Sequence, residues 1–291
     1  MLRALTSNSI MSTRRRFLAA SLASMLAENP TGAVGASGSS AYARAVLSKK
    51  PCGYWRFQEA AGPKVLDESG NNHHGMARGF IRYQNFNSAM HEATEVGYVF
   101  DGSSAHVEIP HHAVFSQPNS GAGMSVEVWL CSLRNDFSGE GPHDCLHWLG
   151  KGDPGQQEWT FRHYSPRSRH PGRISACVFD AKTGKYAEAV IDEPFQAKSS
   201  WMHVVATFDA GDATSPHAGV SIYADGRLVS SPASLPEAGY MAQAVMPVVG
   251  NAPVRIGTHT KKRFFTGYLD EVAIYPRVLS PEEVADNFRA A

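Results

Sequence analysis

The strand-like segment Phe264 to Pro276 contains an acidic residue that needs a partner. Side chains of an extended chain point alternately to opposite faces, so Asp270 is predicted to share a face with Val272 and Ile274. If those apolar residues face the core, the Asp270 carboxylate points inward too. An unpaired buried charge costs several kcal/mol, so this position requires a cation, an arginine or several backbone N–H donors.

The turn Asp67-Glu68-Ser69-Gly70-Asn71 offers oxygen ligands of the matching kind. Its carboxylate, amide and backbone carbonyl oxygens are the hard ligands that Ca²⁺ prefers. In the alternative interpretation, Asp67 and Asn71 cap their own turn through hydrogen bonds, and Asp270 accepts backbone N–H groups. The residue types alone allow both interpretations.

Aromatic and basic residues are interleaved in the middle of the chain. Flat aromatic side chains stack on sugar rings, and polar neighbours add directional hydrogen bonds. The sequence thus suggests a ligand-binding surface that consists of Trp148, Trp159, Arg162, His163 and Tyr164. Alternatively, part of this set belongs to the core, because alternation places Trp159 and Phe161 on one face and Arg162 and Tyr164 on the other.

The sequence contains no evident pair of catalytic carboxylates. Glycoside hydrolysis needs two carboxyl groups roughly 5 to 10 Å apart, yet no Glu-x-Glu or Glu-x-Asp occurs, and Glu127 is the lone acid of its predicted strand. No Gly-x-Ser-x-Gly nucleophile motif occurs either. The adjacent histidines His73-His74 and His111-His112 diverge on an extended chain and cannot hold one ion together. We therefore expect a protein without catalytic activity, and a hydrolase or lyase with dispersed acids is the alternative.

Composition limits the classes of partner. Equal numbers of basic and acidic residues, 27 of each, give a formal net charge of zero. This balance argues against nucleic acid as a partner. A hydrophobic content of 43% together with many Gly and Pro residues is typical of a turn-rich globular protein. Because no apolar run reaches roughly 18 residues, we expect no membrane-spanning helix.

The first 41 residues are predicted to be an export signal and a flexible segment, followed by one domain over residues 42–291. The stretch Thr13 to Leu18 carries consecutive arginines before Phe and Leu, and apolar and then small residues follow, which resembles a twin-arginine signal. Cleavage is expected after Ala36 or after Ala41, and the mature protein is expected in the periplasm or outside the cell. A mitochondrial-type transit peptide and a plain flexible arm are the alternatives.

Short segments rich in β-branched and aromatic residues, bounded by Gly, Pro, Asn or Asp, follow one another from about Tyr42. They include Met124–Leu133, Glu158–Tyr164 and Trp201–Asp209. Asp225-Gly226 between two apolar segments predicts a tight hairpin. Helix is expected only over Ala41–Leu47 and after Ser280, where Pro281 and Glu283 complete a capping box. The sequence therefore predicts an all-β protein, an antiparallel sandwich of two sheets with little helix.

Several motifs resemble laminin-G-like domains of the bacterial branch, which belong to the concanavalin A-like lectin/glucanase jelly rolls. The resemblance rests on Tyr54-Trp55-Arg56, Asp67-x-Ser69-Gly70-Asn71, His74-Gly75, Val126-Glu127-Val128-Trp129 and Gly267-x-Leu269-Asp270-Glu271, and it continues from about Tyr42 to Ala291. It implies a structural calcium between the Asp67 turn and Asp270, with Asn71 as a further ligand. The fold hosts lectins, adhesion modules, glycosidases and lyases, so it does not specify an activity.

Together these observations predict an exported, noncatalytic recognition module that binds a glycan and holds a structural Ca²⁺. One alternative is a structural or adhesion domain that binds an extracellular protein. The other is a glycoside hydrolase or polysaccharide lyase of the same fold.

Overall fold

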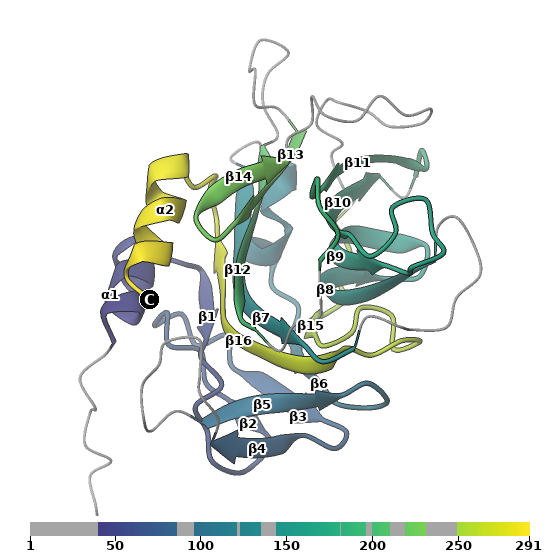
Figure 1. Ribbon diagram of the computed structural model, residues 1–291. Coiled ribbons are helices and arrows are strands. Elements are labelled where there is room, and N and C mark those ends of the chain that lie inside the picture. Colours follow the sequence, from purple (N-terminus) through teal and green to yellow (C-terminus); the bar gives the residue numbers. More distant parts are fainter. Residues whose placement is uncertain are drawn as a thin grey trace, which may run out of the picture. The chain divides into compact units, whose positions relative to one another are not determined.

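The computed structural model describes residues 40–85, 96–120, 123–134, 144–180, 182–195, 200–209, 219–230 and 249–291. These residues form two antiparallel sheets that pack face to face, with one helix near each end of the described chain (Figure 1). The predicted all-β jelly-roll sandwich is therefore confirmed. The predicted export segment lies outside the described residues, apart from Ser40 and Ala41, and stays a prediction.

Sheet A has the strand order β14-β13-β12-β7-β16-β5-β4, and β1 pairs with a further part of β16. Its strands are β1 (Gly53–Trp55), β4 (Arg82–Asn85), β5 (Val96–Asp101), β7 (Met124–Ser132), β12 (Met202–Asp209), β13 (Gly219–Ala224), β14 (Arg227–Ser230) and β16 (Thr266–Tyr275). The chain thus places β16, close to its end, in the middle of the sheet beside β7.

Sheet B has the order β11-β10-β9-β8-β15-β6-β3-β2. Its strands are β2 (Lys64–Val65), β3 (Gly75–Arg78), β6 (His106–Ile109), β8 (Cys145–Asp153), β9 (Gln156–Tyr164), β10 (Ile174–Asp180), β11 (Lys185–Val190) and β15 (Val254–Ile256). A 3-10 segment, η1 (Ala113–Ser120), follows β6.

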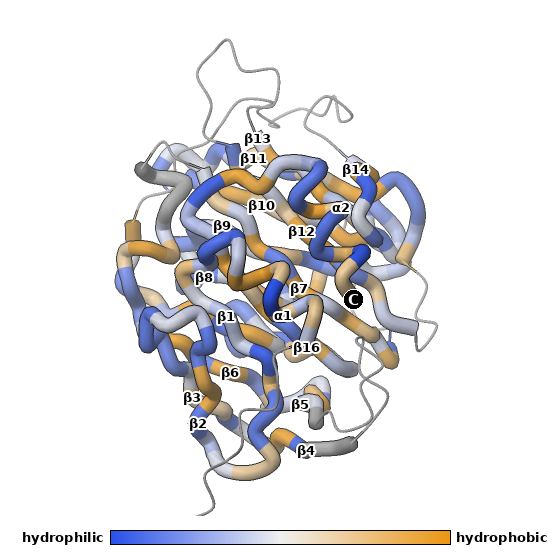
Figure 2. The backbone as a smooth tube through the Cα atoms, turned by 90° about the vertical axis from the view of Figure 1, so that its left-hand side faces the viewer, coloured by the Kyte–Doolittle hydropathy of each residue, from blue (hydrophilic) through white to orange (hydrophobic). Residues whose placement is uncertain are grey.

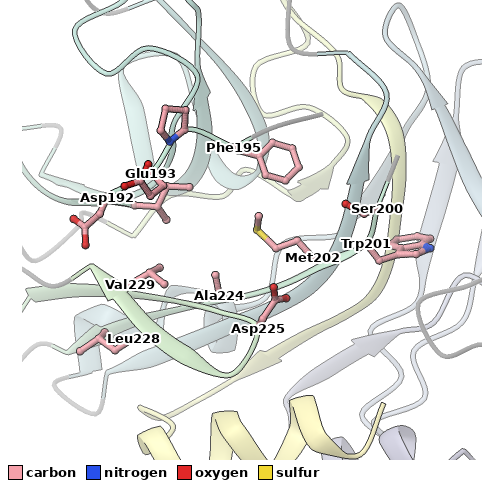
Figure 3. A pocket seen from close by; sticks show the side chains of 12 residues that line it. Asp192, Glu193, Phe195, Ser200, Trp201, Met202, Ala224, Asp225, Leu228 and Val229 are labelled. Carbon is pink, nitrogen blue, oxygen red and sulfur yellow. The ribbon is translucent and has the colours of Figure 1, made fainter. Parts of the chain in front are cut away.

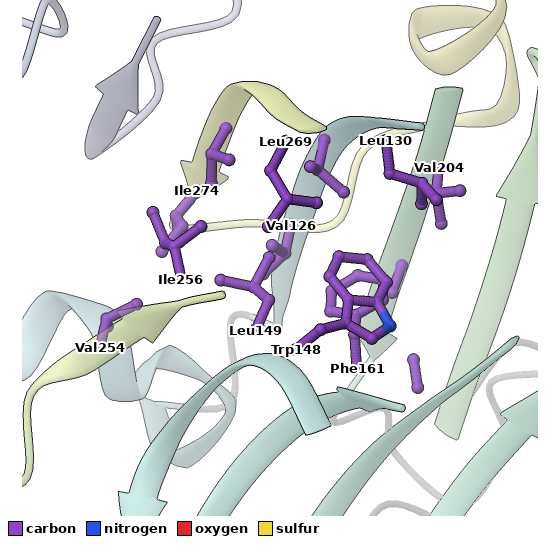
Figure 4. Packing of buried hydrophobic residues seen from close by; sticks show 14 of the residues in the cluster. Val126, Leu130, Trp148, Leu149, Phe161, Val204, Val254, Ile256, Leu269 and Ile274 are labelled. Atoms are coloured by element: carbon purple, nitrogen blue, oxygen red, sulfur yellow. The ribbon is translucent and has the colours of Figure 1, made fainter. Parts of the chain in front are cut away.

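The main core fills the space between the sheets, as the alternation of the strands requires. Trp148 and Phe161 of sheet B point toward sheet A, where Leu130 and Val204 meet them (Figure 4). The hydropathy of the chain changes repeatedly along the strands (Figure 2). None of the helices in the described part of the chain has the length and apolar character needed to cross a membrane.

Helices α1 (Ala41–Ser48) and α2 (Pro281–Arg289) pack against each other on the side of sheet A that faces away from sheet B (Figure 1). The Ser280 hydroxyl accepts the backbone N–H of Glu283, and the Glu283 carboxylate accepts that of Ser280, which confirms the predicted capping box. A second apolar cluster, which includes Tyr42, Trp129, Tyr275 and Val284, lies beneath the helices. The central strands β7, β12 and β16 of sheet A are therefore buried on both faces where the helices lie.

A buried polar network ties these layers together. The Glu127 carboxylate is fully buried on the helix side of β7 and accepts hydrogen bonds from Tyr42, His203, Tyr275 and Asn287 at 2.5 to 3.1 Å. Burial alone would raise the pKa of Glu127, but its bonds with His203 and the tyrosines outweigh burial and hold that pKa below its usual value. The lone acid of this strand is therefore a structural residue.

A β-bulge in β16 reverses the predicted direction of Asp270. Asp270 lies opposite Trp129 and Ala273 lies opposite Glu127, so β16 contains one extra residue between these two pairs. Glu271 is at the bulge, and its φ is 53°. Asp270 therefore faces the helix side with Trp129, whereas Val272 and Ile274 face the core. The prediction that Asp270 shares their face is wrong, because simple alternation does not pass through a bulge.

Candidate functional site

Three of the five predicted ligand-binding residues face the space between the sheets. Trp148 and Trp159 belong to the main core and are 1% and 0% exposed. His163 is 2% exposed, and its ring meets Phe195 edge-on at 5.7 Å. The prediction of a stacking surface is wrong for these residues, because alternation turns them inward, where no sugar can reach them.

Arg162 and Tyr164 lie on the outer face of sheet B. Both side chains are buried there and interact with the carboxylate of Glu188. Glu188 pairs with Arg162 at 2.5 Å and with Arg169 at 2.8 Å, and it accepts the Tyr164 hydroxyl at 2.7 Å. Burial raises the pKa of Glu188, but the charges of Arg162 and Arg169 and the Tyr164 hydroxyl outweigh it, so the pKa is lowered. These contacts fix the outer face of the sheet and leave neither ring nor guanidinium open to a ligand.

The residues predicted to bind calcium each make hydrogen bonds of their own. Asp67 Oδ1 accepts the backbone N–H of Tyr54 and Ser69, both at 2.9 Å, and Oδ2 accepts that of His73 at 2.8 Å. The Asn71 side-chain amide donates to the carbonyls of Pro51 and Cys52. Both Asp67 oxygens thus accept backbone N–H groups of the turn and of the neighbouring strand, and the Asn71 amide is tied to the chain before β1, as turn capping requires.

Asp270 adds no ligand to such a shell in the expected direction. Its Oδ1 accepts the backbone N–H of Glu271 at 2.9 Å, and the side chain is 2% exposed. Within the described ranges, no group of three or more His, Cys, Asp or Glu side chains could hold a metal ion. The geometry corresponds to the turn-capping alternative, and calcium binding stays a prediction.

The four cysteines are all buried and unpaired. Cys131 lies in β7 of sheet A, and Cys145 and Cys177 lie in β8 and β10 of sheet B. Burial raises the pKa of all four thiols, so none has the character of a reactive thiolate.

A cavity of about 610 Å³ opens between the sheets at the end where β11 and β12 meet the hairpin β13–β14. We call it the end groove and define it by Asp192, Glu193, Phe195, Trp201, Met202 and Asp225. Figure 3 shows the loop with Asp192, Glu193 and Phe195 on one side and Asp225, Leu228 and Val229 of the hairpin on the other, with Met202 between them. The groove therefore combines an apolar floor with acidic groups from both sheets.

Asp225 is held in place by the hairpin that the sequence predicts. Asp225 and Gly226 have φ of 48° and 74°, as the two central residues of a type I′ turn require. The backbone N–H of Asp225 donates to His203 O at 2.9 Å, and its Oδ1 accepts the His203 N–H at 3.0 Å. A ligand that enters the groove thus meets a carboxylate in a fixed position.

Trp201 stands at the rim of the end groove. Consecutive side chains of a strand alternate, so Met202 faces the core and Trp201 faces the outer side of sheet A. The Trp201 ring is half-buried, and its centroid lies 6.1 Å from that of Tyr268. The indole thus points away from the space between the sheets, and the exposed Leu228 of the hairpin supplies apolar surface on the groove side.

The end groove contains none of the five residues predicted from the sequence. Its acids come from a loop and a turn, and its apolar residues belong to the edge of the core, so no local pattern marks them as a site. The Asp225-Gly226 pair has a recognisable sequence pattern, but that pattern predicts a hairpin and not a binding site. Only the packing of β11 and β13 places these residues together.

Comparisons with known proteins agree with this fold. Residues 101–285 match the family model described as "Concanavalin A-like lectin/glucanases superfamily". A comparison with curated proteins finds no matching sequence.

Among solved structures, domain 4 of AbnA, a GH43 extracellular arabinanase from Geobacillus stearothermophilus in complex with arabinotriose, is similar at 17% identity and a TM-score of 0.54, with 82% of this chain and 98% of that domain covered. The receptor binding domain of botulinum neurotoxin C/D mosaic serotype is similar at 14% identity and a TM-score of 0.57, with 82% and 51% covered. The binding domain of botulinum neurotoxin DC in complex with SialylT is similar at 10% identity and a TM-score of 0.56, with 84% and 52% covered. The chain thus spans about half the length of the toxin domains, and at these identities the likeness concerns the fold.

Proposed function

We propose that this chain, which belongs to the concanavalin A-like lectin/glucanase superfamily, is a noncatalytic carbohydrate-binding module whose ligand occupies the end groove. The observation that carries the proposal is the combination, in one cavity, of apolar surface from Met202, Phe195 and Leu228 with acidic acceptors from a loop and a turn. Structural neighbours solved with arabinotriose and with SialylT support a glycan as the ligand class. From the sequence alone, we also propose that the protein is exported, and that it acts in the periplasm or outside the cell.

Each part of the groove has a distinct role in this proposal. The apolar face of the sugar ring packs on the Leu228 side chain, which is exposed and lines the groove. Asp225, Asp192 and Glu193 accept hydrogen bonds from sugar hydroxyls. Lys, Arg and His are absent from the described residues that line the groove, so it favours neutral sugars over acidic ones.

The test is a glycan array followed by calorimetry on the best ligand. Leu228→Ala and Asp225→Asn are expected to weaken binding by about tenfold, which corresponds to about 1.4 kcal/mol. Glu193→Gln changes an exposed side chain, so a loss of affinity in this variant cannot come from misfolding. Phe80→Ala is the matched control, because Phe80 is 62% exposed and lies outside the groove.

Two results would overturn the proposal. A blank array for the folded protein would favour the adhesion alternative, in which a protein is the partner. Wild-type affinity in all three groove variants would place the glycan elsewhere.

Glycoside hydrolysis is a second candidate, because Asp225 approaches the groove from one sheet edge and Asp192 and Glu193 from the other (Figure 3). Two carboxyl groups across a bound sugar are the minimum that this reaction needs. Prolonged incubation with the ligand, followed by chromatography of the products, separates the two functions. We expect intact ligand, whereas shorter products that disappear in Asp225→Asn would establish the hydrolase.

A further inference from the structure

A second cavity, of about 390 Å³, lies at the opposite end of sheet B, where β2, β3 and β6 form its edge. We call it the edge pocket and define it by Lys64, His74, Met76, Arg78 and Glu108. Its residues come from three strands and from the loop before β3. Unlike the end groove, it is rich in basic side chains, although the whole chain has a formal net charge of zero.

Strand register places the pocket residues on one face. Lys64 lies opposite Met76, Met76 opposite Glu108, and Glu108 opposite Arg255. Directly opposed residues of neighbouring strands share a face, so these four side chains form a row across the outer face of sheet B. Arg78, two residues after Met76, stands on the same face.

The only acidic residue that lines the described pocket is already neutralised. Glu108 accepts Lys261 Nζ at 2.6 Å and lies 3.4 Å from Arg255 Nε and 3.5 Å from Arg78 Nε. Burial raises the pKa of Glu108, but the bond with Lys261 and the charges of Lys261, His106 and Arg255 outweigh burial and lower it. Arg255 also pairs with Asp153 at 2.9 Å, so the basic groups available at the pocket are Arg78 and Lys64.

His74 adds a hydrogen-bond donor at a defined ring nitrogen. Its Nδ1 accepts the backbone N–H of Asp67 at 3.0 Å, so in the neutral ring the proton resides on Nε2. The Arg78 side chain is 54% exposed, and Lys64 is exposed as well, so both can reach a ligand. Met76 and Pro110 supply apolar surface beside these donors.

We propose that the edge pocket binds the carboxylate-bearing sugar of an acidic polysaccharide. The Arg78 guanidinium and the Lys64 ammonium pair with the carboxylate, since charge-assisted bonds of this kind are the stronger ones. His74 Nε2–H and Glu108 serve sugar hydroxyls as donor and acceptor, and Met76 contacts the ring. This site is independent of the end groove, whose acids would repel the same ligand.

The experiment compares an oligomer of galacturonic acid with a neutral galactose oligomer of equal length by calorimetry. We expect the folded protein to bind the acidic oligomer at least tenfold more tightly, and the affinity to fall as salt is added, because the site is partly exposed. Arg78→Gln and Lys64→Gln are each expected to weaken binding of the acidic oligomer about tenfold. In both variants Arg255 and Lys261 still hold Glu108.

Glu193→Gln, in the end groove, is the control and should bind the acidic oligomer like the wild type. Equal affinity for the two oligomers, or wild-type affinity in both pocket variants, would overturn the proposal. Competition by acetate or inorganic phosphate as strong as that by the oligomer would show a general anion site and would overturn the sugar assignment. Loss of neutral glycan binding in Leu228→Ala would affect the proposal for the end groove alone, so the two proposals can fail separately.

Discussion

At the scale of single residues, the buried Glu127 carboxylate makes a strong prediction. Its oxygens accept hydrogen bonds from four side chains, one each from α1, β12, β16 and α2. Glu127→Gln keeps the shape of the side chain but loses the charge, so these bonds weaken. We expect a loss of about 2 kcal/mol in the free energy of unfolding, measured by urea denaturation.

Glu282→Gln is the matched control for this loss. Glu282 is exposed and accepts only the Ser280 hydroxyl among the described residues. The expected change is within about 0.5 kcal/mol. A Glu127 variant as stable as this control would show that the network beneath the helices is not energetically important.

Asp67 separates the calcium prediction from its turn-capping alternative. Asp67→Ala removes the acceptor of three backbone N–H groups, so we expect a loss of about 3 kcal/mol in unfolding free energy. Because the observed bonds use both oxygens, the melting temperature of the wild type should be the same in calcium and in EDTA. A calcium-dependent rise in the wild type that is missing in Asp67→Ala would instead establish the metal site.

The residue scale also shows where prediction from sequence ends. Alternation correctly separates Trp159 and Phe161 from Arg162 and Tyr164, but it does not indicate whether an outer face is open. Here ion pairs around Glu188 cover one outer face, and two helices cover the other. Tertiary packing therefore decides that none of the predicted rings meets solvent.

At the scale of elements, α1 leads to a prediction about the N-terminus. Ser40 caps this helix: its Oγ accepts the Ala43 N–H at 3.0 Å, and its carbonyl accepts the Arg44 N–H. Of the two predicted cleavage positions, the one after Ala41 removes this cap, and the one after Ala36 retains it. A chain that starts at Tyr42 should therefore be less stable than one that starts at Ser37, by about 1 kcal/mol or more.

Urea denaturation of the two truncated chains measures this difference. A third chain that starts at Ser39 keeps Ser40 and should match the longer one. Equal stability of all three would show that the cap contributes nothing, and the choice between the cleavage positions would lose its structural basis.

Elements with strong periodicity were predictable, and those that depend on distant partners were not. The sequence predicts Met124–Leu133, and the structure has β7 over Met124–Ser132. The short strands β2, β3 and β4 escaped prediction, because polar residues such as Lys64 and Arg82 join a sheet only through their neighbours. The bulge at Glu271 escaped for the same reason, since its positive φ follows from pairing with both β7 and β1.

At the scale of the whole molecule, buried histidines predict how stability responds to mild acid. Burial lowers the pKa of His163 and of His259 to about 4, so both are neutral in the folded protein. In the unfolded chain, histidine takes up a proton near pH 6.5. The unfolded state thus binds more protons between these values, and the unfolding free energy falls as the pH drops from about 6.5 to about 4.

Buried carboxylates act in the same direction at lower pH. The pKa values of Glu127 and Glu188 lie below the usual value in the folded protein, because hydrogen bonds and neighbouring positive charge outweigh burial. Their contribution is fully present above the unfolded value of about 4.3. It is lost as the pH falls through the lower folded values.

These two contributions predict a stability curve with two stages, which urea denaturation at a series of pH values can resolve. Each buried histidine accounts for about 3 kcal/mol of the first stage, at about 1.4 kcal/mol per pKa unit. His259→Gln should therefore flatten the curve between pH 6.5 and 4, and Glu127→Gln should flatten it below pH 4.3. Glu282→Gln should follow the wild type throughout. A wild-type curve that is level from pH 6.5 to 4 would mean that His163 and His259 take up protons in the folded state, in conflict with their burial.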